Sequence, residues 1–151
     1  MIACQLSIIA ENKPGGLSLV TAILRREKIN IRAITIANAG DFGVVNVLVD
    51  DPERAYKVLL KEGLTVKQRA VIAVVIEDKP GGLDGLIQLL AHENINVENA
   101  YGFVLESREK AVFVLDVTEL EKAQEVLKKA KLETLSSEAL SAIEPFHYMK
   151  Y

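Results

Sequence analysis

Cysteine, histidine and tryptophan are scarce in this sequence, and their scarcity excludes several kinds of function. The 151 residues include one cysteine (Cys4), two histidines and no tryptophan. One cysteine cannot form an internal disulfide or a cysteine-based metal cluster. His92, in a helical context, and His147, near the C-terminus, have no partner for a catalytic pair. No zinc-protease, nucleophile-elbow or phosphate-loop motif is present, so we expect no catalytic residue, no metal site, no cofactor and no enzyme activity.

Long apolar runs and an excess of basic residues are also lacking. No segment approaches the roughly 20 apolar residues that a membrane-spanning helix needs. The N-terminal residues show neither the basic segment nor the cleavage site of a signal peptide. Eighteen basic residues stand against 21 acidic ones, whereas nucleic-acid-binding proteins usually carry a clustered basic surface. The sequence therefore predicts a soluble, cytoplasmic protein that binds neither membranes nor nucleic acids.

A segment near the N-terminus recurs in the second half of the chain. Residues 11–17 read ENKPGGL, and 66 residues later residues 77–83 read EDKPGGL. The match continues through Ile-Asn-Ile at 29–31 and Ile-Asn-Val at 95–97, after which the offset grows by two residues. An offset change of that kind marks a loop, and two copies are too few for a solenoid. The sequence therefore predicts a duplicated small domain.

Each half has the same predicted order of strands and helices. Apolar runs at 6–10 and 72–76 are typical of buried strands, and apolar residues at helical spacing follow Pro14 and Pro80. Asn12 and Asp78 are the expected N-caps of these first helices. Further strands are expected at 29–37, 44–49, 95–103 and 112–117. Second helices are expected after Asp-Asp-Pro at 50–52 and after a capping box at 118–121, with a short fourth strand closing each half.

The order βαββαβ predicts the α+β class, with two ferredoxin-like domains in which helices cover one face of an antiparallel sheet. We expect a first domain at residues 1–68, a second at 69–143 and a C-terminal tail at 144–151. Residues 66–70 connect the halves without a Gly-, Pro- or Ser-rich linker. The last strand of the first half is therefore expected to run directly into the first strand of the second. Because each half buries a limited surface, we also expect one rigid pair.

Ferredoxin-like domains serve many functions, so the residues must distinguish among them. RNA-binding modules of this topology need aromatic side chains on the central strands, and the third strands offer only Phe113. Metal carriers need paired cysteines in the first loop, and acylphosphatases need an arginine cradle there. Neither is present.

The Pro-Gly-Gly loops have a physical use in ligand binding. Glycine lets the backbone approach a ligand closely and adopt a positive φ, and the free N–H groups at a helix start suit a carboxylate. A plain strand-to-helix turn would use the same residues. Recurrence of the loop at the same place in both halves favours the binding interpretation.

The chain has the loop pattern Asn/Asp-x-Pro-Gly-x-Leu, an Ile-Asn-Ile or Ile-Asn-Val start of the second strand, and the βαββαβ order. In these features it resembles the ACT domain family of regulatory domains. The resemblance covers residues 3–68 and 69–142, and tandem ACT proteins with no attached enzyme look most similar. It implies that paired domains bind a small amino acid where first loops meet second-strand starts. Binding of that kind would regulate metabolism allosterically.

The resemblance also implies two sets of ligand-binding positions. They are Asn12, Pro14, Gly15, Gly16, Leu17, Asn30 and Ile31 in the first half, and Asp78, Pro80, Gly81, Gly82, Leu83, Asn96 and Val97 in the second. Backbone N–H groups would hold the ligand carboxylate, and Asn12 or Asp78 would contact its polar atoms. Asn30 and Asn96 have an equal alternative, because asparagine is common where a helix ends and the chain reverses.

Two positions depart from the pattern. Many family members have glycine before Ile-Asn, where this chain has Lys28 and Asn94. Leu19 is replaced by Gly85 in the second half, which indicates either a close helix approach, the interpretation we favour, or a tolerated surface substitution.

The aromatic tail at 144–151 is expected to dock, either on its own chain or on a second chain in a homodimer. The alternative to an amino-acid sensor is a regulatory subunit or interaction module of a metabolic enzyme, similar to the small subunit of acetolactate synthase. The sequence does not identify the amino acid or the regulated enzyme.

Overall fold

The computed structural model describes residues 1–143, which divide into two compact units. The N-terminal unit comprises Cys4–Arg69 and Leu140–Ala142. The C-terminal unit comprises Met1–Ala3, Ala70–Ala139 and Ile143. The expectations for the tail at 144–151, including His147, lie outside the described residues.

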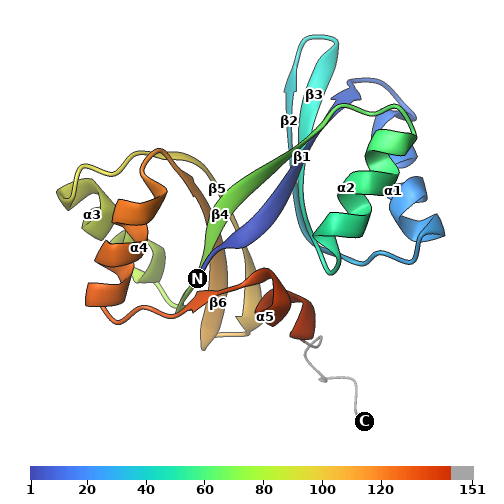
Figure 1. The fold of residues 1–151 in the computed structure, drawn as a ribbon. Coiled ribbons are helices and arrows are strands. Elements are labelled where there is room, and N and C mark those ends of the chain that lie inside the picture. The colour runs from blue at the N-terminus through green and yellow to red at the C-terminus, as the bar shows by residue number, and fades with distance from the viewer. Residues whose placement is uncertain (144–151) are drawn as a thin grey trace. The chain divides into compact units, whose positions relative to one another are not determined.

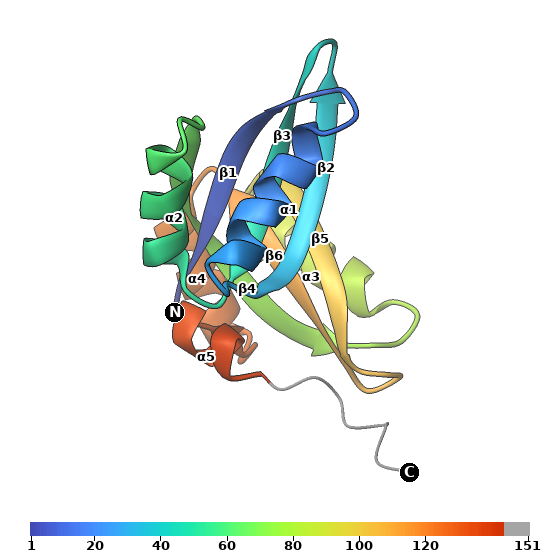
Figure 2. The same cartoon turned by 90° about the vertical axis from the view of Figure 1, so that its right-hand side faces the viewer.

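The N-terminal unit is a four-stranded antiparallel sheet with two helices. Its elements are β1 (Ala3–Glu11), α1 (Gly16–Arg26), β2 (Ile31–Ala39), β3 (Phe42–Val49), α2 (Pro52–Lys61) and the first part of β4 (Val66–Glu77). The strand order is β2-β3-β1-β4, and α1 and α2 lie side by side on one face of the sheet (Figures 1 and 2).

The C-terminal unit repeats this plan with a shorter last strand. Its elements are the rest of β4, α3 (Gly82–His92), β5 (Val97–Glu106), β6 (Lys110–Val117), α4 (Leu120–Lys129), β7 (Thr134–Leu135) and the first half of the short α5 (Ser137–Ala142), whose last three residues belong to the N-terminal unit. The strand order β7-β4-β6-β5 matches that of the N-terminal unit. The two sheets confirm the predicted ferredoxin-like α+β class.

Strand β4 serves both sheets. It runs unbroken for 12 residues, and the boundary between the units falls between Arg69 and Ala70. Its first residues form the last strand of one sheet, and its later residues form the first strand of the next. The prediction that the halves are joined without a linker is confirmed.

Each unit has its own apolar core between its sheet and its helices. In the N-terminal unit the core includes Leu6, Ile8, Val20, Leu24, Val47 and Leu59, and in the C-terminal unit Ile72, Val74, Leu86, Leu90, Leu115 and Leu127. These residues stand at matching positions of the repeat, so the same helical and strand periodicities produced both cores.

The four long helices end in the same way, with one residue in the left-handed region. At the end of α1, the N–H of Lys28 donates to the carbonyl of Arg25 at 3.0 Å, and the N–H of Ile29 donates to that of Leu24 at 2.9 Å. This is the Schellman pattern, which favours glycine at the reversing residue. The reversing residues are Lys28, Gly63, Asn94 and Lys131, with φ of 57°, 84°, 57° and 58°. Lys28 and Asn94 thus adopt the left-handed turn despite lacking the expected glycine.

Replacing Lys28 by glycine should therefore stabilise the protein. A left-handed conformation costs a non-glycine residue roughly 1–2 kcal/mol, and the extra freedom of glycine in the unfolded chain offsets about half of that gain. We expect the melting temperature to rise by roughly 2 °C, measured by differential scanning calorimetry. Glu27, with φ of −87°, provides the control, because Glu27→Gly relieves no strain. An equal rise in both variants would contradict this account.

The helix starts differ from expectation in three places. Helix α2 begins at the predicted Asp-Asp-Pro segment, where Asp51 accepts a hydrogen bond from the N–H of Arg54 at 3.2 Å. The capping box predicted at 118–121 is wrong, because α4 has Glu119 as N-cap and no side-chain cap. Asn12 and Asp78 do not cap α1 and α3, which begin after Gly15 and Gly81. Helix α5 was not predicted, although its start carries a cap signal: the Ser136 hydroxyl accepts a hydrogen bond from the N–H of Ala139 at 3.1 Å.

Candidate functional site

The first loop of each unit uses its two glycines for different purposes. Gly15 and Gly81 adopt φ of 96° and 88°, and a side chain added at either would meet no atom within 4 Å. Gly16 and Gly82 have the opposite constraint, because an added Cβ would collide with the carbonyl oxygen of Glu11 or Glu77. The first glycine is therefore required by backbone conformation, and the second by close packing of the helix start on the preceding strand. The close-approach glycines are thus Gly16 and Gly82.

The starts of α1 and α3 leave backbone donors available. Neither helix has a side-chain cap. Within the described chain, Gly16 donates to the carbonyl of Lys13 and Leu19 to that of Gly15, both at 3.0 Å, while no hydrogen bond engages the N–H groups of Leu17 or Ser18. Gly82 and Gly85 repeat these bonds in the C-terminal unit. Uncapped N–H groups at a helix start, reinforced by the helix dipole, favour an anion such as a carboxylate.

Asn12 and Asp78 attach the first loops to the neighbouring hairpins. The backbone N–H of Asn12 donates to the carbonyl of Asp41 at 2.8 Å, and its side-chain amide donates to the carbonyl of Gly40 at 2.9 Å. In the C-terminal unit, the Asp78 carboxylate accepts a hydrogen bond from the N–H of Arg108 at 2.7 Å. The amide and the carboxylate thus perform the same task with opposite hydrogen-bond polarity. The Asn-to-Asp change between the repeats accompanies this reversal.

An ion pair beside each loop is repeated. The Lys13 ammonium lies 2.8 Å from the Glu11 carboxylate, and Lys79 pairs in the same way with Glu77. The hydrogen bond to Glu11, followed by its charge, raises the pKa of Lys13, so this side chain is a cation at neutral pH. Each loop therefore carries one cationic and one anionic group next to the open N–H groups.

Two cavities flank the first loop of the N-terminal unit. One, of about 330 Å³, lies between the loop and strands β2 and β3, and its lining includes Asn12, Pro14, Leu17, Ile36 and Asn38. The other, of about 470 Å³, lies between the loop and the connection from α2 to β4. Five of the seven predicted ligand positions in this half line one cavity or the other: Asn12, Pro14, Gly15, Gly16 and Leu17.

The C-terminal unit has a smaller hollow at the matching place. It measures about 270 Å³ and is lined by Ile76, Glu77, Gly82, Gly85, Leu86, Ala130 and Leu132. A Cβ added at Gly85 would meet no atom within 4 Å. The prediction that Gly85 marks a close helix approach is therefore wrong, since the glycine borders open space.

The starts of the second strands lie away from the first loops of their own units. In the N-terminal sheet, Ile31 pairs with Val49 at one end of β3, while Phe42 at the other end pairs with Glu11, next to the loop. The C-terminal sheet repeats this with Val97 opposite Val117 and Glu77 opposite Lys110. The two groups of predicted positions therefore do not meet within either unit.

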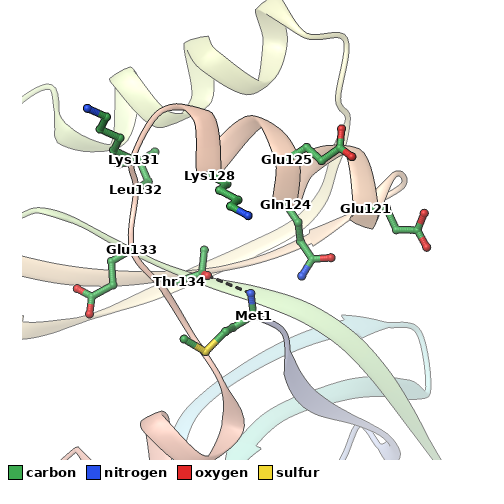
Figure 3. Close-up of a pocket in the computed structure, with 9 residues that line it drawn as sticks. All are labelled: Met1, Glu121, Gln124, Glu125, Lys128, Lys131, Leu132, Glu133 and Thr134. Carbon is green, nitrogen blue, oxygen red and sulfur yellow. Dashed lines mark hydrogen bonds between the residues drawn. The ribbon is translucent and has the colours of Figure 1, made fainter.

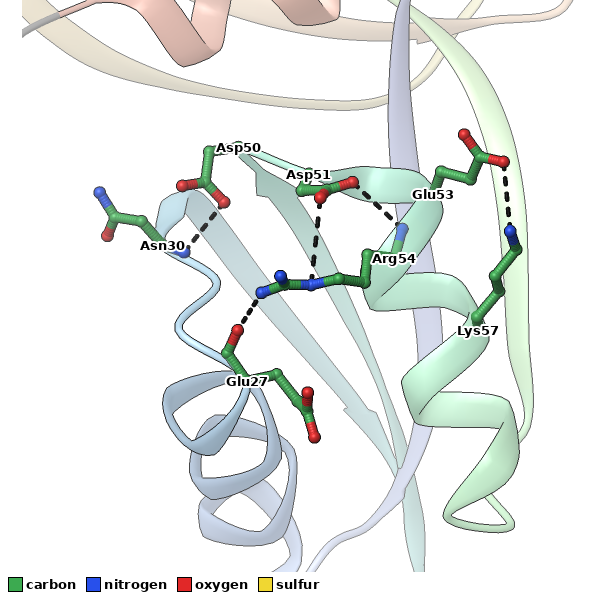
Figure 4. Close-up of polar contacts among 7 residues, drawn as sticks. All are labelled: Glu27, Asn30, Asp50, Asp51, Glu53, Arg54 and Lys57. Carbon is green, nitrogen blue, oxygen red and sulfur yellow. Dashed lines mark hydrogen bonds and ion pairs between the residues drawn. The ribbon is translucent and has the colours of Figure 1, made fainter.

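Asn30 belongs instead to a polar cluster at the end of α1 (Figure 4). The backbone N–H of Asn30 donates to the Asp50 carboxylate at 3.0 Å, and the backbone N–H of Asp50 donates to the carbonyl of Asn30 at 3.1 Å. Arg54 donates to the carbonyl of Glu27 across the same turn. These contacts fix the turn between α1 and β2, as expected of a residue that reverses the chain.

A further cavity, of about 760 Å³, lies on the C-terminal unit between α4 and the strand segment 133–134 (Figure 3). Its charged lining residues are Glu121, Glu125, Lys128, Lys131 and Glu133, and the N-terminal amine of Met1 lies 3.3 Å from the Thr134 hydroxyl. No first-loop residue lines it. This cavity was not predicted, because the alternating charges of α4 are typical of any solvent-exposed helix face.

Sequence reasoning also missed part of the cavity of about 470 Å³. Leu19, Phe42, Gly63, Leu64 and Thr65 line it, although none belongs to the first-loop motif. The sequence signal for them was the change from Leu19 to Gly85 between the repeats. The correspondence of Phe42 with Lys110 follows from the strand register.

Two further features of residues 1–143 bear on function. No group of three or more His, Cys, Asp or Glu side chains there could hold a metal ion. Among the described helices, none has the length and apolar character required to cross a membrane.

Comparisons with known proteins identify relatives of the whole chain. The family model described as an ACT domain pair matches residues 1–144. The crystal structure of protein BT0572 from Bacteroides thetaiotaomicron is 35% identical with a TM-score of 0.88, and the match covers 94% of this chain and 97% of that one. A search of the curated proteins finds no match.

More distant structures share the fold. The regulatory subunit of aspartate kinase from Thermus thermophilus, in its ligand-free form, is 19% identical with a TM-score of 0.61, and the match covers 86% of this chain and 97% of that one. Aspartate kinase from Synechocystis is 18% identical with a TM-score of 0.56, and the match covers 95% of this chain but 27% of that one.

Proposed function

Because the chain belongs to the family of ACT domain pairs, we propose that it is a regulatory protein that binds a small amino acid at one or both of the first loops of its paired domains. The family match spans nearly all 151 residues and leaves no room for a separate catalytic domain within this sequence. The observation that carries the proposal is the repeated loop, with uncapped helix N–H groups beside an exposed Lys–Glu ion pair. We assign the two domains to residues 1–68 and 69–143 and their place of action to the cytoplasm.

The loops supply groups for both ends of an amino acid. In the first domain the N–H groups of Leu17 and Ser18, together with Lys13, suit the α-carboxylate, and the Glu11 carboxylate suits the α-ammonium. Asn12 keeps its side-chain oxygen for the ligand, because its amide nitrogen is used on Gly40. One carboxylate oxygen of Asp78 accepts the hydrogen bond from the N–H of Arg108, and the other oxygen remains for the ligand.

The starts of the second strands belong to this proposal only as a contribution from another ACT domain. Asn30, Ile31, Asn96 and Val97 stand at the far ends of their own sheets from the first loops. They would reach a ligand only where two domains pair. We include them on the basis of the family resemblance.

A glycine-to-asparagine substitution tests the loop as a binding site. Asparagine tolerates the left-handed region better than other side chains, and the space around Gly15 accepts a Cβ. The Gly15→Asn side chain would then occupy the space beside the helix N–H groups. We expect this variant to retain its circular dichroism spectrum and to bind at least 10-fold more weakly in calorimetric titrations.

Gly40→Asn provides the matched control. Gly40 also has a positive φ, 65°, and open space around its Cβ position. It lies at the tip of the β2–β3 hairpin, and Gly40→Asn keeps the backbone carbonyl that Asn12 binds. Its variant should bind like the unmodified chain. Equal affinity in a folded Gly15→Asn variant would make the loop an ordinary turn. Gly81→Asn tests the second loop in the same way.

The proposed partners are a second copy of the chain and a metabolic enzyme. Whole-length similarity to a protein described as a regulatory subunit of aspartate kinase makes an enzyme partner the second candidate for function. A catalytic subunit co-purifying in stoichiometric amounts from source extract would favour that candidate. A chain that purifies alone and responds to an amino acid would favour the free-standing sensor.

A further inference from the structure

The two repeats share their first loops but differ in the residues that surround them. The cavity of about 470 Å³ in the N-terminal unit has an apolar wall next to its charged rim. The wall includes Ile9, Ala10, Pro14, Leu19, Phe42 and Leu64. Three of these side chains are exposed to solvent in this chain, Phe42 at 56%, Leu19 at 50% and Ile9 at 40%. Large exposed apolar side chains gathered around a cavity mark a binding surface.

Structural register identifies the equivalent positions in the C-terminal unit. Phe42 pairs with Glu11, and Lys110 pairs with Glu77. The N–H of Ile9 donates to the carbonyl of Thr65 at 3.0 Å, and that of Val75 donates to Glu133 at 2.9 Å. Lys110 therefore stands in the place of Phe42, and Glu133 in the place of Thr65.

The remaining wall positions change in the same direction. Leu19 corresponds to Gly85, and Gly63, the reversing residue after α2, corresponds to Lys131 after α4. The C-terminal unit thus replaces two large apolar side chains by a lysine and a glycine, and places two further charges nearby. Its hollow is lined by neither Lys79 nor Pro80. The cavity of about 470 Å³ in the N-terminal unit thus combines an apolar wall with the cation, the anion and the loop backbone, and the hollow of the C-terminal unit does not combine them.

The rim of this cavity matches the charges of an amino acid. Lys13 and Glu11, 2.8 Å apart and both solvent-exposed, line the same cavity as Gly15 and Gly16 at the start of α1. A free amino acid carries an anion and a cation separated by one carbon atom, so it can bind both groups at once. The side chain of the ligand then lies against the apolar wall. Both surfaces are withdrawn from water by this contact, which favours binding.

We infer that the N-terminal cavity selects an α-amino acid with an apolar side chain, of the aliphatic or aromatic class, and that the C-terminal unit does not bind this ligand. This inference rests on the proposed function, because it names the ligand class of the first-loop site. It adds a division of labour between the repeats: one unit recognises the ligand, and the other has lost the wall that would hold it.

Calorimetric titration of the full chain tests the inference. The probes are L-leucine, L-phenylalanine, L-aspartate and L-lysine, with isocaproate and L-leucinamide as analogues of leucine that lack one of its two charges. We expect leucine or phenylalanine to bind at least 10-fold more tightly than aspartate and lysine, with one site per chain. Loss of either charge should weaken the leucine signal by a similar factor.

A reciprocal pair of variants locates the wall. Phe42→Lys introduces the residue that the C-terminal unit carries at the same position, so the fold accommodates it, and we expect affinity for the apolar ligand to fall at least 10-fold. Lys110→Phe is the matched control and should leave the affinity unchanged. Size-exclusion chromatography of both variants should show the oligomeric state of the unmodified chain.

Three outcomes would overturn the inference. Unchanged affinity in Phe42→Lys, with binding abolished in Gly15→Asn, would keep the first-loop site but refute its apolar wall. Preference for aspartate or lysine would refute the ligand class alone. A change of oligomeric state in Phe42→Lys without loss of binding would assign the exposed apolar residues to a protein interface. If none of the probes or the other amino acids binds the unmodified chain, the proposed function fails as well.

Discussion

Replacing Gly16 by alanine is expected to lower the melting temperature by roughly 6–12 °C. The added Cβ would collide with the carbonyl oxygen of Glu11, which is backbone and cannot swing aside as a flexible side chain would. Separating helix α1 from strand β1 to make room costs about 3 kcal/mol. Gly82→Ala, which meets the carbonyl of Glu77, should behave alike in the C-terminal unit. Differential scanning calorimetry of each variant gives the measurement.

Gly85→Ala is the control for this pair. Gly85 lies inside α3, and its Cβ position is open. Alanine there should raise stability by about 1 kcal/mol through its higher helix propensity. If Gly16→Ala were as stable as the unmodified chain, the close approach of loop and strand would not be a feature of the folded protein.

Removing a buried leucine from either core should destabilise the whole chain in a single transition. Leu24 and Leu90 occupy the same place in the repeat, and each is 1% exposed. Leucine-to-alanine changes at such positions cost about 2–5 kcal/mol. Because β4 contributes residues to both sheets, unfolding of one unit disturbs a strand of the other. We therefore expect Leu24→Ala and Leu90→Ala each to shift one common melting transition downward.

The shape of the melting curve decides this point. Two separate transitions in Leu24→Ala, with the second at the temperature of the unmodified chain, would show that the units unfold independently. Leu60→Ala provides a control, because Leu60 is 43% exposed and its loss removes little buried surface.

The repeat made the fold predictable, because two copies of one pattern locate each strand and helix twice. Apolar runs before each Pro-Gly-Gly loop became β1 and the second part of β4, and the missing linker became one continuous strand. Lys28 and Asn94 show the limit of residue type as a guide. Schellman hydrogen bonds hold both in a conformation that favours glycine.

The N-cap predictions were wrong where the side chain bonds to a partner from another part of the fold. Asn12 and Asp78 have the side chains of N-caps, yet each bonds to a hairpin that lies far away in sequence. Thr118 likewise donates its N–H to the carbonyl of Asn96 at 3.3 Å and precedes the cap position of α4. A pattern read along the chain does not reveal such partners.

The cavity walls were beyond sequence reasoning for a similar reason. Phe42, Leu19 and Thr65 come from three separate segments and form one surface only in the fold. The repeat marked the loops they surround and the change from Leu19 to Gly85. The correspondence of Phe42 with Lys110 appeared once the strand register showed which residues of the two hairpins match.

A thermal-shift titration of the unmodified chain with each of the twenty amino acids tests the central claim most directly. A ligand that binds the folded state alone raises the melting temperature as its concentration exceeds its dissociation constant, by about 2.7 kcal/mol of added stability at a 100-fold excess. For a chain of this size that is a rise of roughly 5–10 °C. We expect such a rise with at least one amino acid, and the largest rise with an apolar one. Twenty flat titrations up to millimolar concentration would contradict it.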